Sequence, residues 1–384
     1  MFADGGAHIF LVEGHLRKVM SDDGLQTVYI RHRIGVNADA IKWLYENHYL
    51  AIHYTEAPIT ASKSEAQDHA NSKKSAEWKL GNKLDWLKDW GEAGIIVGAD
   101  YGTKNSTYKG GMRVGMVQPE TDITILAFQD NQFRDSVTVE AGTTEEEIYN
   151  DSDTSDEFRR LMDTVNDRGE EGYDEDKIRF LKALKIDEGT AEWVWYRDYP
   201  ALLAVEPQGG AFSRWKQGAD HLQAAFNQVE HLTEVLDDPS YEQKAKLLAP
   251  GQLEILCNEF LRERHDDYLQ HLPVGRSLSD VDIISRQEPN GKRVLAQVTH
   301  ADKTDKLTEK ARDLIEYERG STASETHVMF FGPNGRESDL PDDVVEDIDE
   351  YVANRHVFET IENARPELIE EMLTVPPAGE TPEP

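Results

Sequence analysis

The sequence predicts a mixed α/β protein of the α+β kind, built from two or three domains. Three observations lead to this class. Short apolar runs that alternate like half-buried strands are interleaved with stretches of helical spacing. The 384 residues suffice for two or three domains at roughly 100–200 residues each. With 38% hydrophobic and 9% aromatic residues, the chain has the material for packed cores, which argues against a wholly disordered protein.

Residues 1–135 carry the patterns of the first domain. Residues 27–30 (TVYI) alternate like a strand, and residues 38–47 (ADAIKWLYEN) have helical spacing. Two apolar runs surround the turn-rich stretch YGTKNSTYKGG, which predicts a hairpin. The expected strands lie at 27–30, 49–53, 94–100, 112–117 and 121–128, and the expected helices at 38–47 and 72–90.

The middle of the chain changes composition twice. Residues 136–190 are acidic and polar, as in EEEIYNDSDTSDE, and predict a solvated insertion with a helix around residues 157–165. Residues 191–248 predict a linker and a helical connector. A new pattern begins at Pro250, so the main domain boundary is expected there.

The last domain is expected at residues 249–335. It starts with a helix over 251–264, followed by strands at 281–285 and 293–299. The turn between these strands contains Asn290-Gly291, a strong hairpin signal. A helix at 303–317 and a buried strand at 326–331 complete the domain, and residues 336–384 read as an acidic helical tail with a frayed end.

The net charge is −33, from 74 acidic against 41 basic residues. Such an excess normally argues against nucleic acid binding, because Lys and Arg supply much of the affinity for phosphates. The acidic residues are spread along the whole chain, much as in proteins of halophilic organisms, where molar salt shortens the Debye length to about 3 Å. We therefore interpret the charge as an adaptation to a high-salt cytoplasm. An acidic DNA mimic or a chaperone-like protein is the alternative.

Several other function classes lack their usual sequence signals. No run approaches about 18 apolar residues, and the first residues do not resemble a secretory signal, so we expect a soluble cytoplasmic protein without a membrane partner. The one cysteine, Cys257, lies in an apolar helical stripe and is expected in the core. Dinucleotide, P-loop, zincin and serine hydrolase motifs do not occur.

The hairpin at 281–299 has the layout that metal-dependent phosphodiester cleavage requires. Such chemistry needs carboxylates on adjacent strands to hold Mg²⁺ (or Mn²⁺), together with a cation near the scissile phosphate. Asp282 lies at the start of the first strand, and Gln297 and Thr299 share one face of the second. The preceding helix carries Glu254. Alternatively, the hairpin is an acidic surface turn of an ordinary α/β domain. Gln297 would then be a polar side chain in the core that needs hydrogen-bond partners.

These residues resemble the restriction-endonuclease-like PD-(D/E)xK superfamily, in particular its Mrr-like branch. The resemblance rests on QLE, LPVGRSLSDVDII and RVLAQVT, within residues 249–335. It implies that Asp282 and Glu254 hold the metal ion, with Asp280 as a rival for Asp282, and that Gln297 orients the attacking water or the phosphate. Alternatively, Asp280 and Asp282 are solvent-exposed acidic residues at the end of a strand and bind no metal ion.

The chain departs from the family pattern at Thr299, where the family usually has Lys. Threonine cannot supply a positive charge to the transition state, so either a nearby cation replaces the lysine or the site binds without cutting. His300, Lys303 and Lys306 are the candidate cations. If the site cleaves DNA, we expect Thr299 and Lys303 to lie where the lysine of the family acts and to be catalytic residues.

Two basic clusters are candidates for contact with nucleic acid. Lys306, Lys310 and Arg312 lie on the helix after the hairpin, where an ion-pair face is the alternative. Arg214 and Trp215 offer a cation beside a stacking surface, with a domain linker as the alternative.

The N-terminal region resembles, more weakly, PUA-like domains of the EVE type, which are small barrels that hold a flipped modified base. The resemblance rests on the short strands, the Trp-bearing helix, GIIVGADYG and MRVGMV. A flipped base is read by stacking on aromatic rings and by hydrogen bonds to its edge. The expected pocket residues are Trp43, His53, Tyr54, Trp86, Trp90 and Tyr101. For each of these residues, a packing position in the core is the alternative, since an aromatic side chain at helical or strand spacing is usually a core residue.

Together the two resemblances imply a modification-dependent, restriction-type DNA endonuclease, as in defence systems. An N-terminal PUA-like small barrel would read modified DNA, and a C-terminal nuclease domain would cut it. We expect a homodimer, because enzymes that make double-strand breaks often pair two active sites. The alternatives are a non-catalytic nucleic-acid-binding protein that keeps a degenerate nuclease fold and an α/β interaction protein.

Overall fold

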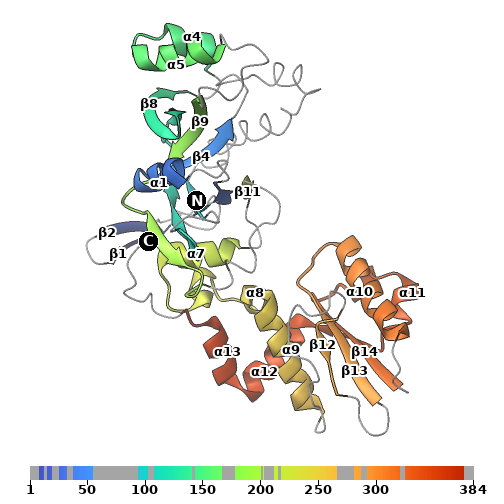
Figure 1. Ribbon diagram of the computed structural model, residues 1–384. Coiled ribbons are helices and arrows are strands. Elements are labelled where there is room, and N and C mark those ends of the chain that lie inside the picture. The colour runs from blue at the N-terminus through green and yellow to red at the C-terminus, as the bar shows by residue number, and fades with distance from the viewer. Residues whose placement is uncertain are drawn as a thin grey trace, which may run out of the picture. The chain divides into compact units, whose positions relative to one another are not determined.

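The computed structural model confirms the mixed α/β class. It describes residues 8–12, 15–19, 26–32, 38–54, 94–102, 108–140, 143–166, 178–199, 202, 212–214, 218–265, 281–286, 292–320 and 325–375. The chain divides into two units, shown in Figure 1. Unit 1 comprises residues 1–199, 206–228 and 378–384, and unit 2 comprises residues 200–205 and 229–377. The principal change of unit therefore comes at residue 229, ahead of the boundary expected at Pro250.

Unit 1 contains an open five-stranded sheet. Its order is β10 (Glu192–Trp195), β6 (Gly111–Val117), β5 (Ile95–Asp100), β3 (Gln26–Arg31) and β11 (Phe212–Arg214). The strands β5 and β6 pair antiparallel, which confirms the hairpin predicted around YGTKNSTYKGG. β3 and β5 run parallel, and the helix α7 (Ala219–Asn227) contacts β3, β5 and β6. A separate hairpin joins β1 (His8–Val12) and β2 (His15–Val19).

A second, four-stranded antiparallel sheet lies in the same unit. Its order is β4 (Tyr49–Tyr54), β9 (Ile178–Lys185), β7 (Ile123–Gln129) and β8 (Gln132–Val139). The strand β9 pairs with β4 on one side and β7 on the other, and most of its side chains are buried. Residues 136–190 are thus more than a solvated insertion. Before β9 they form α4 (Glu145–Asn150) and α5 (Asp156–Asn166), and α5 confirms the helix predicted around 157–165.

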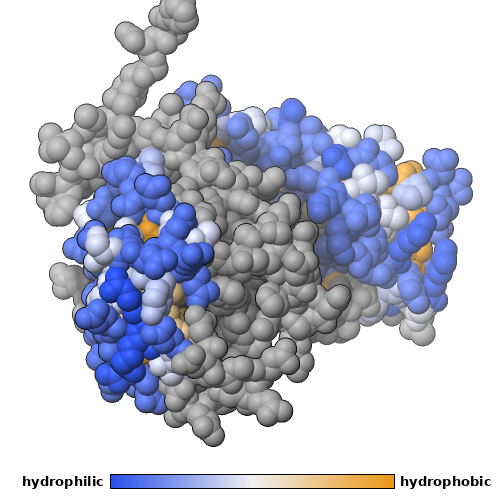
Figure 2. Space-filling view, turned by 90° about the horizontal axis from the view of Figure 1, so that it is seen from above, coloured by the Kyte–Doolittle hydropathy of each residue, from blue (hydrophilic) through white to orange (hydrophobic). Residues whose placement is uncertain are grey.

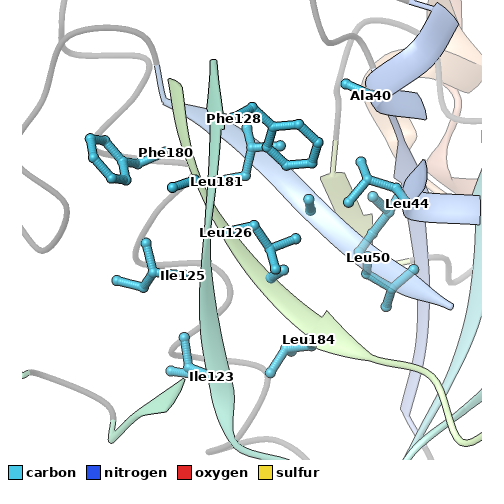
Figure 3. Packing of buried hydrophobic residues seen from close by; sticks show 14 of the residues in the cluster. Ala40, Leu44, Leu50, Ile123, Ile125, Leu126, Phe128, Phe180, Leu181 and Leu184 are labelled. Atoms are coloured by element: carbon cyan, nitrogen blue, oxygen red, sulfur yellow. The ribbon is translucent and has the colours of Figure 1, made fainter. Parts of the chain in front are cut away.

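The two sheets and the helix α1 (Ala38–Glu46) share one hydrophobic core. In Figure 3, Leu126 and Phe128 of β7 lie on the side of Leu44 and Leu50, whereas Ile125 lies on the opposite side. Phe158 of α5 packs near Phe180 on that opposite side, with ring centroids 5.4 Å apart. Neither sheet closes on itself within the described residues, so the expected small barrel is not seen there.

Unit 2 is built on a four-stranded mixed sheet. Its order is β12 (Ile283–Ile284), β13 (Lys292–Val298), β14 (Glu325–Gly332) and β15 (Glu350–Ala353). β12 and β13 pair antiparallel, which confirms the second predicted hairpin, while β13, β14 and β15 are parallel. Within its described residues, this unit contains the helices α8 (Tyr241–Leu247), α9 (Pro250–Arg264), α10 (Thr304–Arg319), α11 (Asp342–Val345), α12 (Asn354–Ala364) and α13 (Pro366–Leu373). Two short 3₁₀ turns, η1 (Leu232–Val235) and η2 (Glu337–Asp339), complete it.

Helices cover both faces of this sheet. Leu295 of β13 and Phe330 of β14 share a core with Leu307 and Leu314 of α10. On the other face, the ring of Phe260 from α9 meets Phe331 at right angles, with centroids 6.0 Å apart. Each residue of β13 can therefore be assigned to one face from the alternation of the strand.

The expected acidic tail at 336–384 is instead largely part of unit 2. β15 extends the sheet, and α12 contacts α8, α9 and α13. Val357, Phe358 and Ile361 recur at helical spacing and are completely buried, which explains why α12 packs despite its acidic surroundings. The surface around these cores is mainly hydrophilic in the view of Figure 2. Among the described helices, none combines the length and apolar character that crossing a membrane requires.

Candidate active site

Asp282 and Gln297 form a side-chain pair across the hairpin of unit 2. Ile283 pairs with Ala296, and Asp282 comes immediately before β12. The backbone N–H of Asp282 donates to the Ala296 carbonyl at 3.0 Å. Gln297 Nε2 donates to Asp282 Oδ2, and the Val298 N–H donates to the same oxygen at 2.8 Å. The structure thus brings together the two residues that the sequence placed at the centre of the site.

The Asp282 carboxyl lies in a partly desolvated position. Burial raises its pKa above the usual range, which opposes ionisation. The Val298 N–H, the positive charge of Lys310 and the Gln297 amide lower the pKa, in that order of strength, without cancelling the effect of burial. Carboxyl groups with perturbed pKa values are enriched at functional sites.

Gln297 is 1% exposed and has one unsatisfied polar atom. Its Nε2 donates to a carboxylate, which cannot donate in return once ionised, so the orientation of the amide is determined. The carbonyl oxygen Oε1 has no hydrogen-bond partner among the described residues. A buried oxygen left in this state costs about 1–3 kcal/mol. A cation or a donor at this oxygen would remove that cost.

Glu254 lies on α9, the helix that covers the sheet face opposite α10, whereas Gln297 shares the face of Leu295. Cys257, one helical turn further along α9, has a fully buried thiol. Burial raises the pKa of this thiol, and the negative charges of Asp282 and then Glu254 raise it further. These charges relate each carboxylate to Cys257 and do not place Glu254 beside the Asp282–Gln297 pair. Cys257 is a core residue, as expected from the sequence.

The oxygen atoms of this site fit a hard divalent cation. Mg²⁺ prefers carboxylate and carbonyl oxygens, and proteins often hold it with one or two carboxylates plus water and substrate phosphates. Asp282 and the carbonyl oxygen of Gln297 provide that chemistry, and Glu254 lies on the helix α9. No group of three or more His, Cys, Asp or Glu side chains suited to a metal ion occurs within the described part of the chain. Asp280, the rival ligand, lies outside the described residues.

Thr299 has a structural role at the carboxyl end of β13. Its N–H donates to the Phe331 carbonyl at 3.0 Å, and its hydroxyl accepts from the Ala301 N–H at 3.0 Å. Its carbonyl accepts from Nδ2 of Asn354, the first residue of α12, at 2.8 Å. Asn354 is 5% exposed, and its Oδ1 has no partner among the described residues. Sequence reasoning missed Asn354 because it assigned that segment to a tail.

The candidate cations differ in their positions. His300 is a weak replacement for lysine, because burial lowers its pKa to about 4 and leaves the imidazole neutral at pH 7. Lys303 is exposed at the N-cap of α10. Lys306 is exposed and pairs with Glu309, while Arg312 pairs with Asp343 at 3.4 Å. These two ion pairs agree with the alternative of a solvated ion-pair face.

The expected base-pocket residues fall into two groups. Trp43 stacks on Phe133 with centroids 4.1 Å apart, and Tyr101 is fully buried with His32 stacked on its ring at 4.2 Å. Both are therefore packing residues in this conformation. His53 and Tyr54 belong to β4 and Arg214 belongs to β11, but the structure describes only their backbone. Trp86, Trp90 and Trp215 lie outside the described residues.

Trp193 is an aromatic residue of unit 1 that sequence reasoning did not select. It belongs to the edge strand β10 and is half-buried. Its ring lies near Tyr45, Tyr108 and Trp195, with centroids 5.7, 6.2 and 5.6 Å away. Its indole N–H is buried and has no hydrogen-bond partner in the described part of the chain. The dense aromatic content of EWVWY was the available signal.

Comparisons with protein-family models, with curated proteins and with solved structures gave no match for this chain.

Proposed function

We propose that this protein is a divalent-metal-dependent DNA endonuclease whose active site is centred on Asp282, Gln297 and Glu254. The observation that carries the proposal is the pair of half-buried Asp282 and buried Gln297 across the hairpin, with the Gln297 carbonyl oxygen left without a partner among the described residues. An all-oxygen site of this kind suits Mg²⁺ or Mn²⁺.

The arrangement of unit 2 supports the same proposal. A helix carrying Glu254 precedes the Asp282–Gln297 hairpin, then come α10 and the parallel strand β14. This order suits the Mrr-like resemblance of residues 249–335. The site also lies near the carboxyl ends of the parallel strands β13, β14 and β15, the edge at which open α/β sheets bind ligands.

The reaction would be hydrolysis of a phosphodiester. The oxygen of a water molecule bonds to phosphorus, and the bond from phosphorus to one bridging oxygen breaks. One water proton goes to that oxygen, and the other remains on the new phosphate or passes to solvent. A bound Mg²⁺ would act as a Lewis acid toward the phosphate. Asp282 and Glu254 would hold it, and Gln297 would orient the phosphate or the attacking water.

Unit 1 would select the DNA in this proposal. The aromatic group around Trp193 supports the idea, because base recognition relies on stacking and on donors aimed at the base edge. Trp193 offers both a partly exposed ring and an indole N–H without a described partner. It joins the expected pocket residues as a candidate for reading a modified base, whereas Trp43 and Tyr101 are packing residues.

The test is a cleavage assay on methylated and unmethylated plasmid DNA, in molar KCl with Mg²⁺ or Mn²⁺. We expect the wild-type protein to nick or linearise one of these substrates and Asp282→Asn to lose that activity. Arg319→Met is the matched control, because Arg319 is exposed at the end of α10 and paired with Asp347. The proposal fails if the wild-type protein cuts neither substrate, or if Asp282→Asn cuts as well as wild type.

A non-catalytic nucleic-acid-binding protein is the second candidate. The observation that favours it is the structural role of Thr299, whose hydroxyl accepts a backbone N–H and supplies no charge. A Mn²⁺ titration separates the two candidates. If the metal site survives, Asp282→Ala binds Mn²⁺ more weakly than the wild-type protein does. If both proteins bind Mn²⁺ equally and still bind DNA, the second candidate is supported.

A further inference from the structure

We propose that unit 1 carries a separate binding site for a linear aliphatic polyamine, in a cavity of about 580 Å³ at one end of the sheet β4-β9-β7-β8. Cavities of this size hold small organic ligands. The inference does not depend on the proposed nuclease function, because all the residues that line the cavity belong to unit 1.

The floor of the cavity is one face of this sheet. Thr124 of β7 pairs with Thr138 of β8 on one side and with Ala183 of β9 on the other. Lys185 is two residues after Ala183 and pairs with Tyr49 of β4. Paired residues, and alternate residues of one strand, point to the same face of a sheet. All of these residues except Ala183 line the cavity, so their side chains form its floor.

Two acidic segments form the walls of the cavity. Glu120 and Asp122 precede β7, and Asp187 and Glu188 follow β9. The lining contains one basic residue, Lys185, which pairs with Glu188 at 2.7 Å. Four negative charges against one positive charge give the cavity a formal charge of −3. The cavity therefore attracts cations and repels phosphates and carboxylates.

The acidic segment after β9 is held firmly against β6. The Asp187 N–H donates to the Met116 carbonyl at 2.8 Å, and Thr190 Oγ1 accepts from the Met116 N–H at 2.9 Å. The Asp187 carboxylate accepts from Gln118 Nε2 at 2.7 Å and from the Gly189 N–H at 2.9 Å. Each carboxylate oxygen can still accept a second hydrogen bond. A site that is formed in advance in this way loses little conformational entropy when a ligand binds.

Thr124 gives an indication of a ligand that is independent of the acidic residues. It is 7% exposed, and its hydroxyl forms no hydrogen bond with a described residue. A buried hydroxyl without a partner raises the free energy of the folded state. Because Thr124 lines the cavity, a donor bound there would contact this oxygen. An ammonium group has three N–H donors and therefore suits both the hydroxyl and the carboxylates.

The distribution of the charges favours an extended ligand over a metal ion. Among the described residues, no three His, Cys, Asp or Glu side chains come close enough together to hold a metal ion. The acids come instead from two segments, and the lining between them includes Ile186 and Tyr49. A linear polyamine matches this pattern, because its ammonium groups are spaced along methylene chains that can contact apolar side chains. A neutral ligand would leave the charge of the cavity unbalanced.

The test is isothermal titration calorimetry with spermidine in molar KCl, and we expect saturable binding by the wild-type protein. Thr124→Val keeps the shape of the side chain but removes the hydroxyl. It should weaken spermidine binding by about 10-fold or more, the loss typical of a hydrogen bond to a charged group. Its Tm should not fall, because the hydroxyl has no partner among the described residues. Thr124→Ser keeps a hydroxyl and should bind spermidine like the wild-type protein.

Glu120→Gln tests the acidic wall and should weaken spermidine binding by up to about 5-fold, as expected for an exposed ion pair. Glu146→Gln is the matched control, because Glu146 is exposed on α4 and does not line the cavity. It should bind spermidine like the wild-type protein.

Four results would overturn the proposal. The first is a wild-type protein that shows no saturable spermidine binding. The second is equal spermidine affinity in the wild-type protein, Thr124→Val and Glu120→Gln, because this would indicate binding to the acidic surface in general. The third is a lower Tm of Thr124→Val, which would show that the hydroxyl serves the fold. The fourth is tighter binding of MgCl₂ or glucose than of spermidine, lost in Thr124→Val, which would assign the cavity to another class of ligand.

Discussion

Gln297→Glu would convert the Asp282–Gln297 pair into two facing carboxyl groups. In the wild-type protein the Gln297 amide donates to Asp282 from a position that is 1% exposed. Two carboxylates at a hydrogen-bonding separation of about 3 Å repel by about 5 kcal/mol at an effective dielectric constant of 20. One of them will instead keep a proton at pH 7, because this costs less. We therefore expect a destabilised variant whose stability depends on divalent cations.

The protonation cost sets the magnitude. Holding a proton at pH 7 on a glutamic acid with an ordinary pKa of about 4.3 costs about 3.7 kcal/mol. For a unit of this size, 1 kcal/mol corresponds to about 2–4 °C in Tm, so the loss could reach roughly 7–15 °C. A cation that binds the folded state at 100 times its Kd restores about 2.7 kcal/mol. Mg²⁺ should thus recover most of the loss.

Thermal unfolding in molar KCl, with and without MgCl₂, measures this effect. Gln297→Leu controls for the loss of the amide, and Asn363→Asp adds one carboxylate at an exposed position of α12. We expect Mg²⁺ to raise the Tm of Gln297→Glu clearly more than that of either control. An equal Mg²⁺ response in Gln297→Glu and Asn363→Asp would refute the idea that this pair lies at a cation site.

Three further results are expected. Asp282→Asn should be at least as stable as wild type at pH 7, because burial raises the pKa of Asp282 and the ionised carboxylate therefore destabilises the folded state. The wild-type protein should become more stable as the pH falls toward that pKa, and urea unfolding should show no such pH dependence in the variant. Burial lowers the pKa of His32 to about 4, so the free energy of unfolding should fall by about 1.4 kcal/mol per pH unit between about pH 6.5 and pH 4. An NMR titration that gives the His32 ring a pKa near 6.5 would contradict this. Gly332→Ala should destabilise unit 2 by about 1–3 kcal/mol in the same urea assay, since its Cβ would lie 2.8 Å from Cζ of Tyr351, and an unchanged midpoint would disagree.

The sequence was informative where local signals are strong. Turn residues between alternating apolar runs gave both hairpins correctly, and in the second one Gln297 donates a hydrogen bond to Asp282. These predictions succeeded because strand alternation and turn chemistry act over a few neighbouring residues.

The failures concern contacts between distant segments. β9 lies in a stretch of acidic composition, yet it pairs with strands more than 50 residues away in sequence, such as Thr124↔Ala183. Asn354 reaches Thr299 across 55 residues, and composition alone gave no reason to look there. Lys310 was predicted as a contact for nucleic acid, but its relation to Asp282 depends on how α10 lies on the sheet. The burial that makes His300 neutral likewise comes from tertiary packing.

The central claim is that a divalent cation binds beside Asp282 and Gln297. The side-chain amide signal of Gln297, assigned by its absence in Gln297→Leu, reports on this position directly. Paramagnetic Mn²⁺ added below stoichiometry in molar KCl should broaden this signal in the wild-type protein and leave it sharp in Asp282→Asn. If Mn²⁺ leaves the Gln297 signal unchanged while it broadens signals of exposed surface carboxylates, no cation site exists at this hairpin and the account is contradicted.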